Sequence, residues 1–260
     1  MTLHHVRLGS GPPLVLVHGL GASWQSWEPL FPALSAQREV IALDLPGFGE
    51  SPPLPGEVSI ATLTDALSGF LDEQGLRDAS LVGSSMGARM VMELARRGVG
   101  GDVVALDPGG FWTDRQRTFF ATTLRASIAL VQHIQPLLPA LTASPVGRTA
   151  LLAQFSARPW ALPKELVLRE LRGYSTAPSM GPAFDALAHG PLQVGAPAGS
   201  LPGRLTIGWG RHDKVTLPSQ AATAIALFPD ATLHWFEHSG HFPLWDEPGP
   251  TAAAVLAATS

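Results

Sequence analysis

The fold of this chain is decided by the stretch Ser80-Leu-Val-Gly-Ser-Ser-Met-Gly-Ala-Arg-Met90. It begins as a short apolar run, typical of a buried strand, and continues as a helix from Met86. The junction reads Gly83-Ser-Ser-Met-Gly87, a G-x-S-x-G motif between a strand and a helix, where this motif exposes a serine hydroxyl. The helix N-terminus adds positive potential for a developing oxyanion. Ser85 is therefore the candidate nucleophile, although an ordinary turn without chemistry would look the same in isolation.

Short apolar runs alternate with helix-length segments on both sides of this stretch. Each run is rich in Val, Leu or Ile, and the segments between them are long enough for crossover helices, as a parallel sheet covered on both faces requires. The clearest helices are Ile60–Gly75, with apolar residues at helical spacing, and Met86–Gly98, which ends in two arginines and a glycine. The predicted strands are 14–18, 39–44, 80–83, 102–107, 204–209 and 232–236.

This alternation stops after Asp107. From Gly109 to about Gly203 the chain has no strand-like run and shows Leu-, Ala- and Pro-rich helical stretches, such as Leu124–Ile134 and Lys164–Leu171. The many prolines suit short helices joined by stiff turns. We therefore expect a mostly parallel α/β core, formed by residues 1–110 and 198–260, with a helical cap inserted at residues 111–197.

The composition describes a globular protein with small, neutral partners. Of the 260 residues, 45% are hydrophobic and 15% charged, enough apolar surface to build a large core. The formal charge of −4 and the lack of a basic run argue against nucleic acid as a partner. The chain has no cysteine, so disulfides, thiolate metal sites and a cysteine nucleophile are excluded.

No targeting signal is recognisable in the sequence. Neither a signal peptide nor a membrane span is present, so we expect a cytoplasmic protein without a membrane partner. His4 and His5 could suggest a metal, but adjacent residues of a strand point to opposite faces. We interpret both histidines as surface residues.

A serine hydroxyl needs a base, and His241 is the best candidate among nine histidines. It follows the last predicted strand, in Ser239-Gly-His-Phe-Pro243, and so belongs to a loop at the carboxyl edge of the sheet, where ligands bind in open α/β sheets. His238 lies three residues earlier and is the weaker alternative.

The carboxylate that orients the histidine is assigned to Asp213. It follows a strand, in Trp209-Gly-Arg-His-Asp213, and completes the chain order Ser, Asp, His. Asp107 ends the strand after the nucleophile helix and is a competitor, because its loop reaches the same edge of the sheet. His212 is interpreted as a neighbour of Asp213 in the loop.

Two backbone N–H groups should hold the oxyanion. One is that of Met86, directly after the nucleophile, and the other is expected from His18-Gly-Leu-Gly21, at Leu20. We interpret His18 as structural, because a residue at the end of a buried strand usually forms local hydrogen bonds.

In this order the motifs resemble those of the α/β-hydrolase family: His18 to Gly21, Asp44-Leu-Pro-Gly-Phe-Gly-Glu-Ser51, Gly83 to Gly87, and the Asp213 and His241 loops. The resemblance covers nearly the whole chain except the cap. It implies the α/β-hydrolase fold, the triad Ser85, Asp213 and His241, and the oxyanion donors Leu20 and Met86. The serine at the motif separates the chain from the dehalogenase and epoxide-hydrolase branches, which have an aspartate there. The loop Asp44–Ser51 lacks the residues of a phosphate or metal site and is interpreted as a shaped loop.

The expected activity is that of a carboxylesterase acting on small apolar esters or lactones, without a cofactor or metal. Trp24, Phe111 and Phe242 adjoin the catalytic loops and are the candidates for the substrate pocket. The oligomeric state is left open.

Two other functions remain open. A carbon–carbon bond hydrolase of vinylogous diketones resembles this chain in its Ser-Asp-His order, its cap and Trp245, four residues after the histidine. Such an enzyme needs a cation to bind the carboxylate of its substrate. The candidates are Arg89, Arg115, Arg117 and Arg125. A solvated surface role is the simpler interpretation of each arginine. A non-enzymatic small-molecule receptor could keep the same fold and triad.

Overall fold

The computed structural model describes residues 2–260 and contains one seven-stranded sheet with the strand order β1-β3-β2-β4-β5-β6-β7. Only β1 runs antiparallel to its neighbour, and the other strands are parallel. The strands are β1 (His5–Leu8), β2 (Pro13–Val17), β3 (Glu39–Leu43), β4 (Ser80–Ser84), β5 (Val103–Leu106), β6 (Leu205–Gly210) and β7 (Thr232–Phe236).

The predicted α/β fold with a mostly parallel sheet is confirmed. All six expected strands are present, each within one residue of its expected bounds. The sequence did not indicate β1, because its four residues are half-buried or exposed at the sheet edge and so lack a continuous apolar run. β1 pairs with β3, and this pairing places His4 and His5 in the fold.

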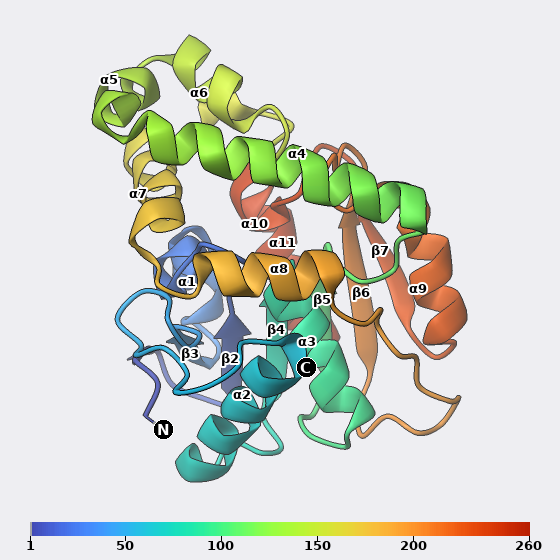
Figure 1. The fold of residues 1–260 in the computed structure, drawn as a ribbon. Coiled ribbons are helices and arrows are strands. Elements are labelled where there is room, and N and C mark those ends of the chain that lie inside the picture. The colour runs from blue at the N-terminus through green and yellow to red at the C-terminus, as the bar shows by residue number, and fades with distance from the viewer. Residues whose placement is uncertain (1) are drawn as a thin grey trace.

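Helices before and after the strands cover the sheet. α3 packs on β4 and β5, and α2 packs on α3 (Figure 1). The 3-10 helix η1 packs against α1, α10 and α11. The helices of this part are η1 (Trp24–Leu30), α1 (Phe31–Leu34), α2 (Ile60–Gln74), α3 (Met86–Arg96), η4 (Pro218–Gln220), α9 (Ala221–Leu227), α10 (Pro243–Asp246) and α11 (Pro248–Ala258).

Between β5 and β6 the chain is helical, and α4 to α7 form a layer at one end of the strands (Figure 1). These elements are α4 (Asp114–His133), η2 (Gln135–Leu137), α5 (Leu138–Ala143), α6 (Pro145–Leu152), η3 (Pro159–Ala161), α7 (Lys164–Thr176) and α8 (Met180–His189). We call residues 114–189 the helical insertion. α4 begins ten residues before the expected stretch, because Thr113 and Gln116 form a capping box at its N-terminus. No helix within residues 2–260 has the length and apolar character to cross a membrane.

Backbone contacts hold the nucleophile turn between β2 and α3. A Cβ added at Gly87 would lie 2.2 Å from the carbonyl oxygen of Val17, and one added at Gly83 would lie 2.3 Å from the carbonyl oxygen of Gly87. Both distances are far below van der Waals contact. The two glycines of the motif therefore let the helix backbone touch the strands, and a side chain at either position would force them apart.

A buried glutamate joins the helical insertion to the core. Glu170 of α7 accepts a hydrogen bond from the Ser26 hydroxyl of η1, which lies 2.8 Å from both carboxylate oxygens. Burial raises the pKa of Glu170 to about 7, and Glu28 also raises it, whereas the Ser26 hydroxyl and Arg169 lower it. This junction therefore titrates near neutral pH.

We predict opposite effects of adding a methyl group to two helical glycines. Gly87→Ala should lower the free energy of unfolding by about 1–3 kcal/mol or more, because the added Cβ meets backbone that must move. Gly69→Ala, within α2, meets no atom within 4 Å and should raise stability by about 0.5–1 kcal/mol. Urea unfolding followed by circular dichroism measures both changes, and equal effects would contradict the packing described here.

Glu170→Gln should change how stability depends on pH. The folded pKa is raised above the ordinary 4.5, so the contribution of Glu170 is greatest below the unfolded pKa and is lost as pH rises through 7. The parent protein should therefore lose about 2 kcal/mol relative to Glu170→Gln between pH 5 and pH 8. Urea unfolding across this range measures the difference. Glu165→Gln, at an exposed position of the same helix, should leave the pH profile of the parent unchanged.

Candidate active site

Ser85 lies at the turn between β4 and α3 in a strained backbone conformation. Its φ is 55° and its ψ is −113°, a region that non-glycine residues seldom adopt and that costs about 1–3 kcal/mol. The Ser85 amide donates to the carbonyl of Leu106, and its carbonyl accepts from the amide of Arg89, at 2.8 and 3.1 Å. The neighbouring strand and the first turn of α3 thus hold the serine in this conformation.

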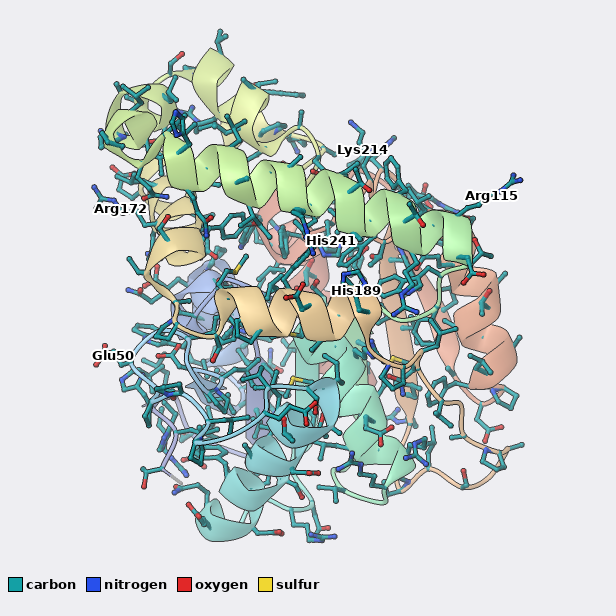
Figure 2. All side chains as sticks on the ribbon, in the orientation of Figure 1. Glu50, Arg115, Arg172, His189, Lys214 and His241 are labelled. Carbon is teal, nitrogen blue, oxygen red and sulfur yellow. The ribbon has the colours of Figure 1, made fainter. Side chains whose placement is uncertain are left out.

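Three predicted residues that are far apart in sequence form one line of hydrogen bonds. Nε2 of His241 lies 2.8 Å from Oγ of Ser85, and Nδ1 lies 2.8 Å from Oδ2 of Asp213. His241 and Asp213 are buried, whereas Ser85 is partly exposed. In Figure 2, His241 lies between α4 and α8. The arrangement allows a proton to pass from the hydroxyl to the imidazole while the carboxylate holds the ring.

Both carboxylate oxygens of Asp213 accept hydrogen bonds from neighbouring residues. Oδ1 accepts from the amides of Val215 and Thr216 at 2.7 and 3.1 Å, and Oδ2 accepts from the Thr216 hydroxyl at 2.7 Å. These hydrogen bonds fix the orientation of the carboxylate. Sequence reasoning missed Thr216, which also lies 3.3 Å from Nδ1 of His241. The pattern of an aspartate followed three residues later by threonine is a known local capping arrangement and could have indicated it.

Asp107, the competing acid, has a different environment. Its Oδ1 accepts from the Gly210 amide at 2.8 Å, whereas its Oδ2 is buried without a hydrogen-bond partner in the described part of the chain. Burial raises the pKa of Asp107 well above its ordinary value, and the nearby carboxylate of Asp213 raises it further. The carboxylate within hydrogen-bond distance of Nδ1 of His241 is that of Asp213.

Asp107, Asp213 and His241 are also the group whose geometry could accommodate a cation. One potential ligand atom from each lies within 4.8 Å of the others, and all three residues are buried. However, Oδ2 of Asp213 already accepts the Thr216 hydroxyl and faces Nδ1 of His241. Because Nε2 of the same ring faces Ser85, we interpret the group as a proton-carrying network.

The loop after β2 touches the nucleophile. A Cβ at Gly19 would lie 3.1 Å from Cβ of Ser85, so the backbone that leads into Leu20 passes directly beside the serine. Met86 is the first residue of α3, and its N–H is therefore among those without an acceptor inside the helix. The two predicted oxyanion donors thus come from segments that meet at Ser85.

His18 is held by local hydrogen bonds. Its Nε2 lies 2.9 Å from the amide nitrogen of Leu45, which can only donate, so the proton of the ring is on Nδ1 and points to the carbonyl of Gly19 at 2.7 Å. Burial lowers the pKa of His18 and keeps the ring neutral. This histidine connects the loop beside Ser85 to the loop after β3.

The loop Asp44–Ser51 is shaped by one buried carboxylate. Asp44 accepts from the amides of Trp24 and Glu50 at 2.7 and 3.0 Å and lies 2.8 Å from Nδ1 of His4. The interpretation of His4 and His5 as plain surface residues is therefore wrong, because both are partly buried and the ring of His5 packs edge-on against Phe70. Pairing of β1 with β3 brings them there.

The three aromatic pocket candidates have different neighbours. The ring of Phe242 lies 4.8 Å from that of His241 and forms an aromatic group with Phe155 and Trp245, at 6.3 and 4.0 Å between ring centroids. Trp24 stacks on Phe31, and Phe111 packs edge-on against Phe228. The pocket role of Trp24 and Phe111 stays a prediction.

A second buried acid, which sequence reasoning missed, ties the helical insertion to the His241 loop. Asp246 accepts from the amides of Gly240 and Ala157 at 2.8 Å each, and from the hydroxyl of Ser156. The His241 amide itself donates to the carbonyl of Phe155 at 2.8 Å. The position of the histidine therefore depends on the segment between α6 and α7.

The alternative histidines lie outside this network. His238 and His212 are exposed, and both line a surface hollow beside Lys214 and Trp160. The amide of His238 donates to Glu247 at 2.9 Å.

Among the four arginines considered for a substrate carboxylate, Arg89 is not a solvated surface residue. It is 3% exposed, on α3. Arg117 donates to the carbonyls of Ala188 and Gly190, Arg125 pairs with Asp185 at 3.2 Å, and Arg115 is exposed.

Comparison with curated proteins finds related sequences over part or most of the chain. Pimeloyl-[acyl-carrier protein] methyl ester esterase of Aeromonas hydrophila is 40% identical over 97 residues, which are 36% of either chain. Bifunctional epoxide hydrolase 2 of Sus scrofa is 41% identical over 96 residues, which are 36% of this chain and only 17% of that protein. An uncharacterized protein of Mycobacterium bovis is 27% identical over 257 residues, covering 92% of this chain and 73% of its own.

Solved structures show the same fold. An esterase from Thermogutta terrifontis superposes with a TM-score of 0.75 at 19% identity, covering 98% of this chain and 92% of its own. The enol-lactonase of Burkholderia xenovorans LB400 gives a TM-score of 0.76 at 20% identity, with coverages of 98% and 95%. The sequence signature described as the alpha/beta hydrolase family matches residues 14–254. Since this match spans nearly the whole chain, the protein belongs to the alpha/beta hydrolase family.

Proposed function

We propose that this protein is a serine hydrolase that cleaves small apolar carboxylic esters or lactones through an acyl-enzyme on Ser85. The observation that carries the proposal is the hydrogen-bonded line from Ser85 through His241 to Asp213, with 2.8 Å at each step. A strained serine at a strand-to-helix turn, joined to a buried histidine and carboxylate, matches the requirements of an activated nucleophile.

In the first half of the reaction, Oγ of Ser85 attacks the carbonyl carbon of the ester while Nε2 of His241 takes the hydroxyl proton. The carbonyl oxygen becomes an oxyanion, which the amides of Leu20 and Met86 would hold. When the tetrahedral intermediate collapses, His241 returns the proton to the leaving alcohol. The acyl group then remains as an ester on Ser85.

In the second half, water attacks the acyl carbon and His241 takes one of its protons. The second tetrahedral intermediate releases the carboxylic acid, and the proton on His241 returns to Oγ of Ser85. The carboxylate of Asp213 stabilises the imidazolium in both halves. Its two amide donors and the Thr216 hydroxyl keep it oriented.

The preference for apolar substrates is supported by the surroundings of His241. Phe242 lies against the imidazole and is joined by Phe155 from the helical insertion and by Trp245. We propose that the helical insertion acts as the cap of the site, because its Phe155 segment is bonded to the His241 loop. The name of the Aeromonas hydrophila relative, a methyl ester esterase, agrees with an ester substrate.

The carbon–carbon hydrolase is less well supported. Trp245 donates its Nε1 hydrogen to the carbonyl of Ser26 at 3.2 Å, which gives it a packing role. The candidate cations Arg117 and Arg125 are bonded to Ala188 and Asp185. Arg89 is bonded to the Pro191 carbonyl and lines a groove that Ser85 does not line. None of the three is therefore a free partner for a substrate carboxylate at Ser85.

Hydrolysis of p-nitrophenyl esters from acetate to decanoate should show repeated turnover by the parent protein and loss of at least about 10³-fold in kcat for Ser85→Ala, because the nucleophile is removed. Ser84→Ala is the matched control, because Ser84 is the last residue of β4 and directly precedes Ser85. This variant should keep the activity of the parent protein. Full activity of Ser85→Ala would refute the nucleophile. Binding without multiple turnover by the parent would instead favour the receptor function.

Substitution of the two acids should separate their roles. Asp213→Asn should lower kcat by about 10⁴-fold, because the amide stabilises the wrong imidazole tautomer and no imidazolium. Asp107→Asn keeps the shape of a side chain that accepts from the Gly210 amide, and it should keep kcat within about threefold of the parent. Steady-state kinetics on p-nitrophenyl butyrate at pH 7.5 measures both. A larger loss for Asp107→Asn than for Asp213→Asn would reassign the acid.

A further inference from the structure

A groove of about 730 Å³ lies apart from the hydrogen-bonded line at Ser85. It is formed by the N-terminal end of α2, by one side of α3, by α8 and by the segment 190–194 that follows α8. Neither Ser85, Asp213 nor His241 lines it. Its apolar lining comes mainly from Val58, Ile60, Pro182, Ala186, Leu192 and Val194. Leu192 and Val194 are 48% and 59% exposed, an unusual position for two neighbouring large apolar side chains.

Arg89 supplies a buried cation to this groove. It is one helical turn after Ser85 on α3 and is 3% exposed. Its Nη2 donates to the carbonyl oxygen of Pro191, whereas Nε and Nη1 are buried without a hydrogen-bond partner in the described part of the chain. Unsatisfied buried donors of a charged group are costly, so such a group in a native structure calls for a partner.

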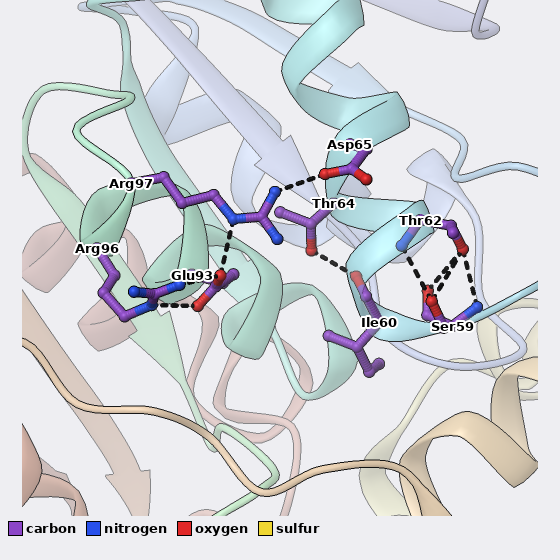
Figure 3. A network of polar contacts seen from close by, with 8 residues as sticks. All are labelled: Ser59, Ile60, Thr62, Thr64, Asp65, Glu93, Arg96 and Arg97. Atoms are coloured by element: carbon purple, nitrogen blue, oxygen red, sulfur yellow. Dashed lines mark hydrogen bonds and ion pairs between the residues drawn. The ribbon is translucent and has the colours of Figure 1, made fainter.

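No carboxylate among the described residues forms an ion pair with Arg89. Glu93, on the next turn of α3, bonds to Arg96 and Arg97 at 2.7 Å each, as Figure 3 shows. Asp185 pairs with Arg125 at 3.2 Å, and Glu57 is exposed at the rim of the groove. The acids of the groove therefore leave the Arg89 guanidinium unneutralised.

Two further features add positive potential at the same place. The α2 helix begins in the groove, where the Ser59–Thr62 capping box takes up the Thr62 amide (Figure 3). The amides of the first helical residues, Ile60 and Ala61, have no acceptor inside the helix and contribute to the positive end of the helix dipole. Burial and the nearby positive charge of Arg117 lower the pKa of Arg89 to about 10, against the raising effect of Glu93. A bound anion would relieve both effects.

We propose that this groove is a binding site for a small amphipathic monocarboxylate of the medium-chain fatty acid type. The carboxylate would replace the neutral Pro191 carbonyl as the acceptor of the Arg89 guanidinium, so that both partners of the hydrogen bond carry a charge. The hydrocarbon chain would lie along Val58, Leu192 and Val194. The groove combines one unneutralised cation, Arg89, with apolar walls. This combination favours a ligand with a single negative charge and an apolar body over a phosphate.

The segment 190–194 allows this exchange. It lies outside the helices and strands, and its Pro191, Leu192 and Val194 are exposed. It is attached to the core by the bond from the Gln193 amide to the carbonyl of Gly110, at 3.0 Å. The carbonyl of Pro191 can therefore turn away from Arg89 without breaking a helix or a strand.

Isothermal titration with sodium octanoate tests the proposal, with octanamide as the neutral ligand of the same length. Octanamide should bind at least about tenfold more weakly, because its neutral amide accepts from the Arg89 guanidinium without forming an ion pair. Equal affinities of the two ligands would overturn the proposal, since the cation would then have no role.

Two substitutions locate the binding site. Ala61→Trp, at an exposed position on the groove wall, should fill the groove and raise the octanoate dissociation constant by about tenfold or more. Arg89→Met should raise it by a similar factor and remove the preference over octanamide. The matched controls are Ala61→Ser, which leaves the groove open, and Arg115→Met, which removes an exposed cation outside it.

Octanoate is also a product of ester hydrolysis and could occupy the catalytic site. Binding there would be unaffected by Ala61→Trp, so an unchanged dissociation constant in this variant overturns the proposal, whether or not the protein hydrolyses esters. Circular dichroism and thermal unfolding establish that each variant is folded. If Arg89→Met does not fold, Ala61→Trp decides the question alone.

Discussion

The rest of the site depends on the backbone of Ser85, which is held at a positive φ where β4 turns into α3. Such a conformation persists only when its surroundings enforce it. Here the enforcement comes from backbone packed on backbone, since Gly83 meets Gly87 and Gly87 meets Val17 at distances that leave no room for a Cβ. The same packing brings the loop of Gly19 against the serine. One close contact therefore positions the hydroxyl and both predicted oxyanion donors.

The helical insertion is part of this arrangement and not an independent cover. Its Phe155 accepts the amide hydrogen of His241, and Asp246 holds Gly240 and Ala157 together. Glu170 makes a second connection, from α7 to Ser26 of the core. A displacement of the helical insertion would therefore also displace the imidazole of His241. Through this coupling, substrate binding or a change of pH at the helical insertion would alter the geometry of the site.

Burial acts differently on the charged groups of this protein according to the donors and charges around them. Asp213 receives two amides and a hydroxyl, whereas Asp107, beside it, has one carboxyl oxygen without a donor among the described residues. Burial and the nearby Asp213 raise the pKa of Asp107 well above its ordinary value. Arg89 shows the converse case, since burial lowers its pKa and a carbonyl is its only hydrogen-bond acceptor among the described residues.

The sequence by itself determined the elements whose signals are local. The six buried strands are continuous apolar runs, and the motif at Ser85 is complete within five residues. Loops that follow parallel strands share one edge of the sheet, which is why Ser85, Asp213 and His241 could be named together before their distances were known. Only the tertiary structure decided the rest: the edge strand β1, the choice of Asp213 over Asp107 as the partner of His241, the role of Asp246, and the burial of Arg89. Each of these depends on contacts between segments far apart in the chain, and burial and electrostatics at such contacts leave no trace in local residue patterns.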